Sequence, residues 1–262
     1  MIKTVNRLII AMAVMITSCE KVINIDLNTT DPKLVVEANI TNLPGHYTVS
    51  LTHTVNYYDP NVFPTVSGAS IVIYDNAGNS ETLTEFSPGN YRTNLLQGVE
   101  GRAYSVKILS SGNEYHATST MPFHVSIDSL NLERNDRGNG YRLICKFLDP
   151  QGISNFYKLQ ISSNDIAAFD STSIRIVADG FADGQELSLT YRTRLVPGDS
   201  VTAMLECIDK PVYDFYRTLT NVEGGVRSFL SAPPSNPITN INNGGFGYFS
   251  AHSVSLKTVV VQ

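Results

Sequence analysis

The chain has 262 residues, enough for one large domain or two of ordinary size. Hydrophobic residues make up 42% and charged residues 16%, which supports a packed core and argues against wholesale disorder. The net charge is −5 and no run of Lys and Arg supplies a basic face, so nucleic acid is excluded as a partner. The 13 Tyr, the 11 Phe and the short runs of Val, Ile and Thr favour strands over helices.

The first 18 residues are arranged like a secretory signal peptide. A basic segment with Lys3 and Arg7 precedes an almost wholly apolar stretch, residues 8–16, and two small residues follow. This apolar stretch is about half as long as a membrane-spanning helix, and no later segment reaches that span. The sequence therefore excludes a polytopic membrane protein and predicts an exported chain from which residues 1–18 are removed.

A cysteine stands directly after the small residues, in the sequence "ITSC" at Ile16–Cys19. This resembles the processing site of bacterial lipoproteins, in which the new N-terminal cysteine carries the lipid. Two or three acyl chains would anchor the protein stably, since each buried methylene contributes about 0.8 kcal/mol. The alternative is an ordinary signal peptide with an incidental cysteine. We expect a membrane anchor at Cys19 and a tether over residues 19–32.

Short strand-like runs begin after Pro32 and are separated by Pro-Gly and Gly-Asn turn sequences. They predict an Ig-like antiparallel β-sandwich over residues 33–122. Three of the runs, "SIVIYDNAGN", "SPGNYRTN" and "GRAYSVKI", are also similar to transthyretin-like and carboxypeptidase-regulatory-like sandwiches of exported proteins. The expected strands are 33–41, 47–52, 69–75, 90–94, 103–109 and 114–120.

The second region, residues 123–262, is predicted to be another antiparallel β domain with one short helix. The helix is expected near residues 210–222, because Asp209 can cap it and Pro211 suits its first turn. An irregular stretch at 231–245 precedes a terminal strand at 251–262. The other expected strands are 141–149, 155–163, 172–178, 185–191 and 199–209.

Cys145 and Cys207 are the other two cysteines, and each falls on the apolar face of a predicted strand. An exported protein can form disulfides, so a disulfide between them is one interpretation. Two buried free thiols that act as small hydrophobic side chains are the favoured alternative. No C-x-x-C pair indicates structural zinc.

The motifs of catalysis are missing. Gly-x-Ser-x-Gly, His-Glu-x-x-His and the glycine-rich phosphate loops do not occur. The sequence "DGFADGQE" brings Asp179, Asp183 and Glu186 close together, and carboxylate oxygens suit calcium. Their spacing does not match the twelve-residue calcium loop, so a solvated hairpin is favoured. The sequence predicts no enzyme, no catalytic residue, no metal site and no cofactor.

Aromatic residues in connecting segments are candidates for contacts with a partner. The segment 54–68 holds Tyr57, Tyr58 and Phe63 together with two prolines, which would stiffen it. These side chains could bind a partner; alternatively, Tyr57 and Phe63 fold back as a lid over the sandwich end, and the sequence leaves both open. Three further aromatic residues are expected in the core: Phe246, Tyr248 and Phe249.

Five motifs spread from Cys19 to Ser255 resemble a Bacteroidetes outer-membrane lipoprotein family, domain of unknown function 4249. They are "CEKVINIDL", "NYYDPNVFPTVSGASIVIYDNAGN", "STMP", "DKPVYDFYRTL" and "NPITNINNGGFGYFSAHSVS". The resemblance implies an outer-membrane lipoprotein, often encoded beside a TonB-dependent receptor, with Cys19 as the lipidated residue. A dense acidic tract often follows that cysteine in surface-displayed members. Here Glu20 is followed by Lys21, so the periplasmic and cell-surface faces both stay open.

Two functions follow from these features. The first is an outer-membrane-anchored binding accessory that works with a TonB-dependent transporter in nutrient capture, its ligand unknown. The second is a structural or adhesive module of the cell envelope with no transport role. A hydrolase would need a site assembled from distant residues.

Overall fold

A computed structural model describes residues 31–56, 60, 62–134, 140–164, 174–180, 182–193, 195–223 and 236–262. The fold in this described part is mostly β, as predicted, with the helix α2 (Lys210–Glu223). None of the described helical residues forms a helix that is long and apolar enough to cross a membrane.

The strands of the first region are short and follow the predicted runs. The first three are β1 (Leu34–Thr41), β2 (Thr48–His53) and β3 (Ser70–Asp75). The structure adds two short ones that the sequence did not predict, β4 (Ser80–Thr82) and β5 (Thr84–Ser87). The remaining three are β6 (Asn90–Arg92), β7 (Ala103–Ser110) and β8 (Asn113–Thr120).

The second region continues with seven further strands. They are β9 (Ser129–Arg134), β10 (Tyr141–Leu148), β11 (Phe156–Ser163), β12 (Arg175–Ala178), β13 (Glu186–Thr193), β14 (Ser200–Ile208) and β15 (Phe246–Val260). The last strand begins five residues earlier than predicted.

The strands form three sheets in the described part of the chain. An eight-stranded sheet has the order β12-β11-β14-β15-β1-β2-β6-β5, a four-stranded sheet the order β4-β3-β7-β8, and a three-stranded sheet the order β13-β10-β9. Alternate residues of each strand are buried, for example Val36, Ala38 and Ile40 in β1. This period of two is what the sequence showed and what a sheet with one face in the core requires.

Two hydrophobic cores lie between the eight-stranded sheet and the two smaller sheets. In the first sandwich the strands from β15 to β6 share a core with the four-stranded sheet, which contributes Ile71, Ile73 and Ile108. In the second sandwich β11 and β14 share a core with the three-stranded sheet, which contributes Leu143 and Phe147. Each fully buried side chain of this kind contributes about 1.5–3 kcal/mol.

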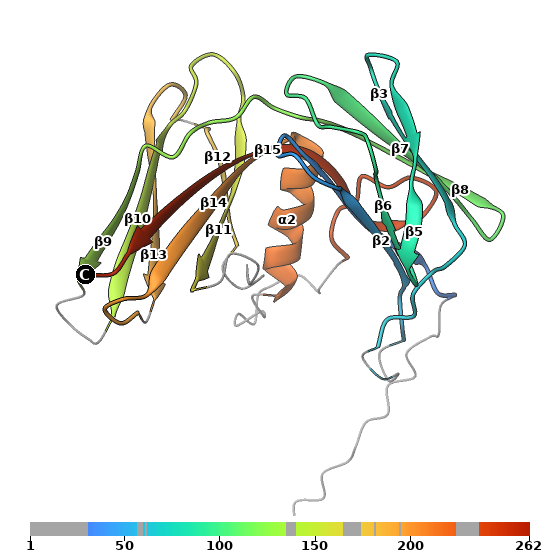
Figure 1. Cartoon of the computed structure of the whole chain (residues 1–262), viewed down its shortest axis with the longest axis horizontal. Coiled ribbons are helices and arrows are strands. Elements are labelled where there is room, and N and C mark those ends of the chain that lie inside the picture. The colour runs from blue at the N-terminus through green and yellow to red at the C-terminus, as the bar shows by residue number, and fades with distance from the viewer. Residues whose placement is uncertain are drawn as a thin grey trace, which may run out of the picture. The chain divides into compact units, whose positions relative to one another are not determined.

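The strand β15 belongs to both sandwiches. Its first half pairs in parallel with β1, in a register that places Val35 opposite Phe246. Its second half pairs antiparallel with β14, in a register that places Cys207 opposite Ser253. Figure 1 shows this long strand in red, running between the two groups of strands. The division of the chain at residue 122 stays a prediction, and β15 joins strands from both of the predicted parts.

The helix α2 starts where the sequence places it. Asp209 Oδ1 accepts a hydrogen bond from the backbone N–H of Val212 at 3.2 Å, and this contact caps the helix. The apolar face of α2 buries Val212, Phe215 and Tyr216. It contacts β15, β11 and β12, and Figure 1 shows it beside β15. The helix therefore covers the face of the eight-stranded sheet opposite the second core.

The predicted hairpin between residues 172–178 and 185–191 is wrong. β12 pairs with β11 in the eight-stranded sheet, whereas β13 pairs with β10 in the three-stranded sheet. The connection between β12 and β13 therefore crosses from one sheet to the other. The turn residues between the two runs suggested a hairpin. They could not show that the two strands pair in different sheets, because such pairing leaves no local signal in the sequence.

Gly247 is required for the pairing of β15 with β1. Its φ is +88°, and an added Cβ would lie 2.0 Å from the Val36 carbonyl oxygen. We expect Gly247→Ala to lower the free energy of unfolding by about 2–4 kcal/mol, because strain and overlap combine. Gly112→Ala is the matched control, since Gly112 has φ +79° but no atom within 4 Å of the added Cβ. Urea unfolding measures both, and equal losses would contradict the prediction.

Candidate functional site

A pocket of about 360 Å³ lies at one end of the first sandwich. It is lined by the turn after β3, by the start of β4 and by the segment that precedes β7. Its volume falls at the lower end of the range for small-molecule sites. The lining residues that matter for its chemistry are Asp75, Asn79, Glu81, Leu95, Gln97 and Arg102.

Asp75 builds the turn on one side of the pocket. It ends β3 and accepts hydrogen bonds from the backbone N–H groups of Ala77 at 3.0 Å and Asn79 at 2.8 Å. Arg102 Nη1 lies 2.8 Å from Asp75 Oδ2. Burial raises the pKa of Asp75, but the bonds from Asn79, Ala77 and Arg102 outweigh burial and leave the pKa below its ordinary value. Asp75 is therefore an ionised structural acceptor.

Glu81 holds the opposite wall. Its carboxylate accepts the backbone N–H groups of Asn94 at 2.5 Å, Leu95 at 3.1 Å and Leu96 at 2.6 Å. Burial raises the pKa of Glu81, and these hydrogen bonds lower it further than burial raises it. The carboxylate thus fixes three successive residues of an irregular segment onto β4. The wall is formed before any ligand arrives.

Arg102 and Leu95 are the groups of the lining that are left to contact a ligand. Arg102 uses one nitrogen for Asp75, and its side chain is 34% exposed, so its guanidinium has further N–H donors. Leu95 is 86% exposed at the rim. A guanidinium beside an apolar wall suits a small ligand with hydrogen-bond acceptors.

The pocket and the entry of the chain lie at opposite ends of β1. Gln97 Nε2 donates to the Gly45 carbonyl at 3.3 Å, and an added Cβ at Gly98 would lie 2.0 Å from the Thr41 carbonyl oxygen. Thr41 is the last residue of β1, whereas the chain enters the strand through Lys33. Eight strand residues separate these ends by about 26 Å, at roughly 3.3 Å per residue.

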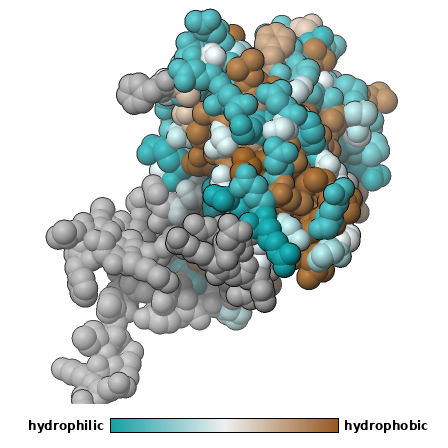
Figure 2. All heavy atoms as spheres, turned by 90° about the vertical axis from the view of Figure 1, so that its left-hand side faces the viewer, coloured by the Kyte–Doolittle hydropathy of each residue, from teal (hydrophilic) through white to brown (hydrophobic). Residues whose placement is uncertain are grey.

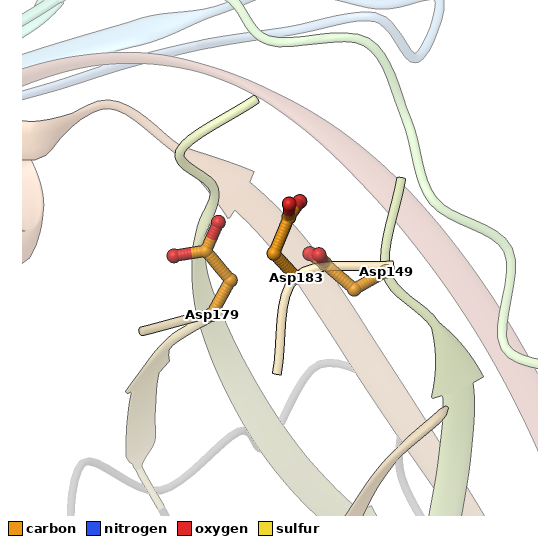
Figure 3. Close-up of side chains that lie close together, drawn as sticks. All are labelled: Asp149, Asp179 and Asp183. Carbon is orange, nitrogen blue, oxygen red and sulfur yellow. The ribbon is translucent and has the colours of Figure 1, made fainter. Parts of the chain in front are cut away.

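Three aspartates meet at the end of the second sandwich. Asp149 follows β10, Asp179 follows β12, and Asp183 lies in the connection to β13. One oxygen of each lies within 4.8 Å of the others, and Figure 3 shows the three side chains close together. Glu186 is not part of the group, because Lys146 Nζ binds it at 2.8 Å. The sequence missed Asp149, which lies far from the other two along the chain.

Hydrogen bonds show what the aspartates do for the fold. Asp179 accepts the N–H of Asn155 at 2.8 Å, and Asp183 accepts the N–H of Gly152 at 2.6 Å. Asp149 accepts the N–H of Gly184 at 3.1 Å and the hydroxyl of Tyr157. The three carboxylates therefore join the β10–β11 connection to the β12–β13 connection. Their oxygens are of the type that calcium prefers.

A buried ionic cluster lies on the face that α2 covers. Lys158 Nζ on β11 lies 2.6 Å from Glu206 Oε2 on β14, and the two side chains are 7% and 3% exposed. His252 Nε2 on β15 lies 3.6 Å from the same oxygen. Lys158 also lies 4.5 Å from the centre of the Tyr216 ring, a cation–π contact with α2. The cluster thus joins three strands and the helix.

Burial keeps the histidine and the tyrosines of this cluster neutral. It lowers the pKa of His252, against which Glu206 acts in the opposite direction. Burial also raises the pKa of Tyr216, whose hydroxyl lies near Tyr248. Lys158 and Glu206 lie directly opposite each other in the register of β11 and β14. We interpret the cluster as a structural element that fixes the register of these strands.

The structure places some of the site and core residues predicted from the sequence and leaves others undescribed. Cys19, Tyr57 and Tyr58 lie outside the described residues. Phe63 is 51% exposed, so it is not a closed lid. Phe249 is fully buried in the first core, as predicted.

The two remaining aromatic residues of the predicted core are half-buried. Phe246 and Tyr248 are of intermediate exposure, and Tyr248 packs beside α2 against Phe215 and Tyr216. They belong to the covered face of the sheet.

Cys145 and Cys207 are two buried free thiols, and the alternative of a disulfide between them is not formed in the structure. They lie on β10 and β14, which belong to different sheets, and both pack into the second core. Burial raises the pKa of Cys145 to about 12 and the pKa of Cys207 to about 11. Both thiols are therefore protonated at neutral pH and act as small hydrophobic side chains.

The second sandwich also carries exposed apolar side chains. Leu148, Val196 and Val260 are 58%, 62% and 56% exposed. Figure 2 shows the side of the molecule where β9, β10 and β13 lie, with hydrophobic residues interspersed among hydrophilic ones. Scattered exposure of this kind is ordinary for a protein surface.

Comparisons with known proteins give a family and distant structural likenesses. A family model described as "Domain of unknown function (DUF4249)" matches residues 20–258. None of the curated proteins matches the chain.

Solved structures with similar strands are very different in sequence. A two-domain fibronectin type-III segment of chicken tenascin is 12% identical to this chain. The match covers 68% of this chain and 91% of the tenascin segment, with a TM-score of 0.23. The Yersinia pseudotuberculosis adhesin InvE is 15% identical, with 66% and 55% covered at 0.23. A protein from Bacteroides uniformis ATCC 8492, whose name suggests carbohydrate binding, is 11% identical, with 87% and 98% covered at 0.26. TM-scores this low leave the function to be argued from the residues of this chain.

The buried pair Lys158–Glu206 makes a testable contribution to stability. Lys158→Met leaves Glu206 without its partner, so the free energy of unfolding should fall by about 3–5 kcal/mol. The double variant Lys158→Met/Glu206→Leu should recover most of that loss. Lys146→Met is the control, because its pair with Glu186 is solvent-exposed, and it should cost far less. Urea unfolding measures all three variants, and similar losses for Lys158→Met and Lys146→Met would refute a buried pair.

His252 predicts a loss of stability in acid. Its pKa in the folded state lies below its ordinary value of 6.5, because burial disfavours the charged ring and the charge of Lys158 acts in the same direction. Below that ordinary value the unfolded chain binds the proton more readily, so stability falls with pH toward the folded pKa, by up to about 1.4 kcal/mol per pH unit.

His252→Gln should lack this contribution. Urea unfolding of both proteins from about pH 7.5 to about pH 5 should show a steeper decline for the unmodified chain. Parallel declines would contradict the prediction, because they would mean that His252 binds a proton as readily in the folded state as in the unfolded chain.

Proposed function

The chain belongs to the DUF4249 family, because the family model matches residues 20–258, and from this premise we propose an envelope binding protein. In this proposal a lipid on Cys19 holds the protein to the outer membrane, and the pocket beside Arg102 takes a small ligand. The observation that carries the proposal is the position of a pre-formed pocket at the end of β1 opposite the entry of the chain.

The tether supports this arrangement. Residues 20–32 join Cys19 to the start of the first sandwich and could span roughly 40 Å if extended. The pocket lies about 26 Å further along β1, at roughly 3.3 Å per residue. A ligand could thus be captured away from the membrane surface.

The rigidity of the pocket supports binding rather than catalysis. The carboxylates of Asp75 and Glu81 are already saturated by hydrogen bonds within the protein. Ligand binding then orders few side chains, and the entropic cost of binding is small. A shape that is fixed in advance suits a protein that captures a nutrient and passes it on.

The partner in this proposal is a TonB-dependent transporter. Apolar side chains stand exposed around the pocket end, where a protein surface could cover them: Leu43 (39%), Leu95 (86%), Val99 (40%) and Phe123 (70%). Apolar groups beside a polar site are typical of surfaces that bind proteins. The alternative, a structural or adhesive module, needs neither the pocket nor these side chains.

The partner is tested by recovering the lipidated protein from solubilised outer membranes. We expect a barrel transporter to co-purify, and Leu95→Asp to reduce its recovery at least about tenfold, because a charge would have to be buried in the contact. Leu148→Asp is the control, since Leu148 is exposed in the second sandwich.

Two further results test the lipid anchor and decide between the two functions. Cys19→Ala should move the protein from the membrane fraction to the soluble fraction. Repeated recovery of the lipoprotein alone, with growth on every scarce nutrient unchanged by its loss, would favour the structural or adhesive module.

A further inference from the structure

The connection between β2 and β3 presents two apolar side chains to solvent. Val62 is 74% exposed and Phe63 is 51% exposed. Residues 60–69, "PNVFPTVSGA", include no charged residue. Exposed apolar neighbours on an uncharged segment need a reason, because water disfavours them and the fold does not bury them.

The fold holds this segment firmly. The Pro64 carbonyl accepts the backbone N–H of His53 at 2.8 Å, and Thr65 forms a β-bridge with Thr52. Val66 is buried in the first core and donates its N–H to the Leu51 carbonyl at 3.0 Å. The exposure of Phe63 is therefore fixed by the backbone on its C-terminal side.

The same segment lies at the end of the sandwich where the chain enters. Thr54, which follows β2, donates its N–H to the Lys33 carbonyl at 2.9 Å and accepts the Lys33 N–H with its hydroxyl at 2.9 Å. His53 lies opposite Leu34, the first residue of β1. Residue 33 and the Phe63 segment are thus both anchored to the last residues of β2. Only the 14 residues from Cys19 to Pro32 separate this end from the lipid of the proposed anchor.

We propose that Val62 and Phe63 contact the interfacial region, between headgroups and acyl chains, of the bilayer that holds the lipid on Cys19. This inference rests on the proposed lipid anchor and adds a second contact with the membrane. An exposed aromatic side chain beside an exposed aliphatic one suits the boundary between headgroups and acyl chains. A single segment of this size binds a bilayer weakly by itself, but the tether keeps it at high effective concentration.

A second contact would also orient the protein. With the Phe63 end on the bilayer, β1 points away from the membrane and the pocket end stands about 26 Å further out, at roughly 3.3 Å per residue. A tether alone would leave the protein free to turn.

The chain offers a clean probe for this contact because it contains no Trp. In the lipidated full-length protein, Phe63→Trp places a single fluorophore on the segment, and Leu95→Trp places one at the pocket rim as a matched control. Both proteins are reconstituted into phosphatidylcholine vesicles whose acyl chains carry bromine, a short-range quencher. Val62→Trp is a second probe of the same segment.

We expect Trp at 63 and at 62 to lose most of its emission and to shift to shorter wavelength, while Trp at 95 stays unquenched. Unquenched Trp at 63 in protein that floats with the vesicles would overturn the membrane contact and leave the anchor intact. The segment would then be free for a protein partner. Equal quenching at 63 and 95 would also overturn the inference, because it would mean no preferred orientation. Protein that does not float with the vesicles would refute the lipid anchor, and with it this inference.

Discussion

The pairing of β15 with β1 on one edge and with β14 on the other holds the eight-stranded sheet together. Without this strand β1 would keep only β2 as a neighbour, and β14 would keep only β11. Gly247 permits the pairing by leaving room for the Val36 carbonyl. A single strand with two sets of partners thus defines the frame in which the pocket, the aspartates and the ionic cluster are placed.

The ionic cluster depends on this frame. β15 brings His252 beside Glu206, and Tyr248 beside Tyr216 on α2. Burying an ion pair such as Lys158–Glu206 carries a desolvation cost that can exceed the attraction between the charges. The gain lies in specificity, because a shift of one residue between β11 and β14 would turn one of the two charges into the second core. We therefore interpret the polar groups of this face as fixing the register of the strands.

Local features of the fold could be predicted from the sequence, and distant pairings could not. Alternating apolar residues predicted most strands, and Asp209 with Pro211 predicted α2, because both signals act over a few residues. The pocket depends on Glu81 capturing three backbone N–H groups, and the aspartate group depends on a chain that crosses between sheets. Neither has a local pattern. Cys145 and Cys207 lie on the apolar faces of their strands, so their burial could be predicted. Whether they form a disulfide could not, and in the structure both are free thiols.

The place of β15 in the chain also determines when the fold can be completed. β1 is among the first structured segments to be synthesised and β15 is the last, yet the two lie side by side. Until the ribosome has added residue 246 onward, β1 has one open edge, and closing so long a loop is slow. The proposed export of the chain would benefit from this delay, because a secretion channel carries unfolded chains. The same open edge is where a second, incomplete copy could pair wrongly before the last strand arrives.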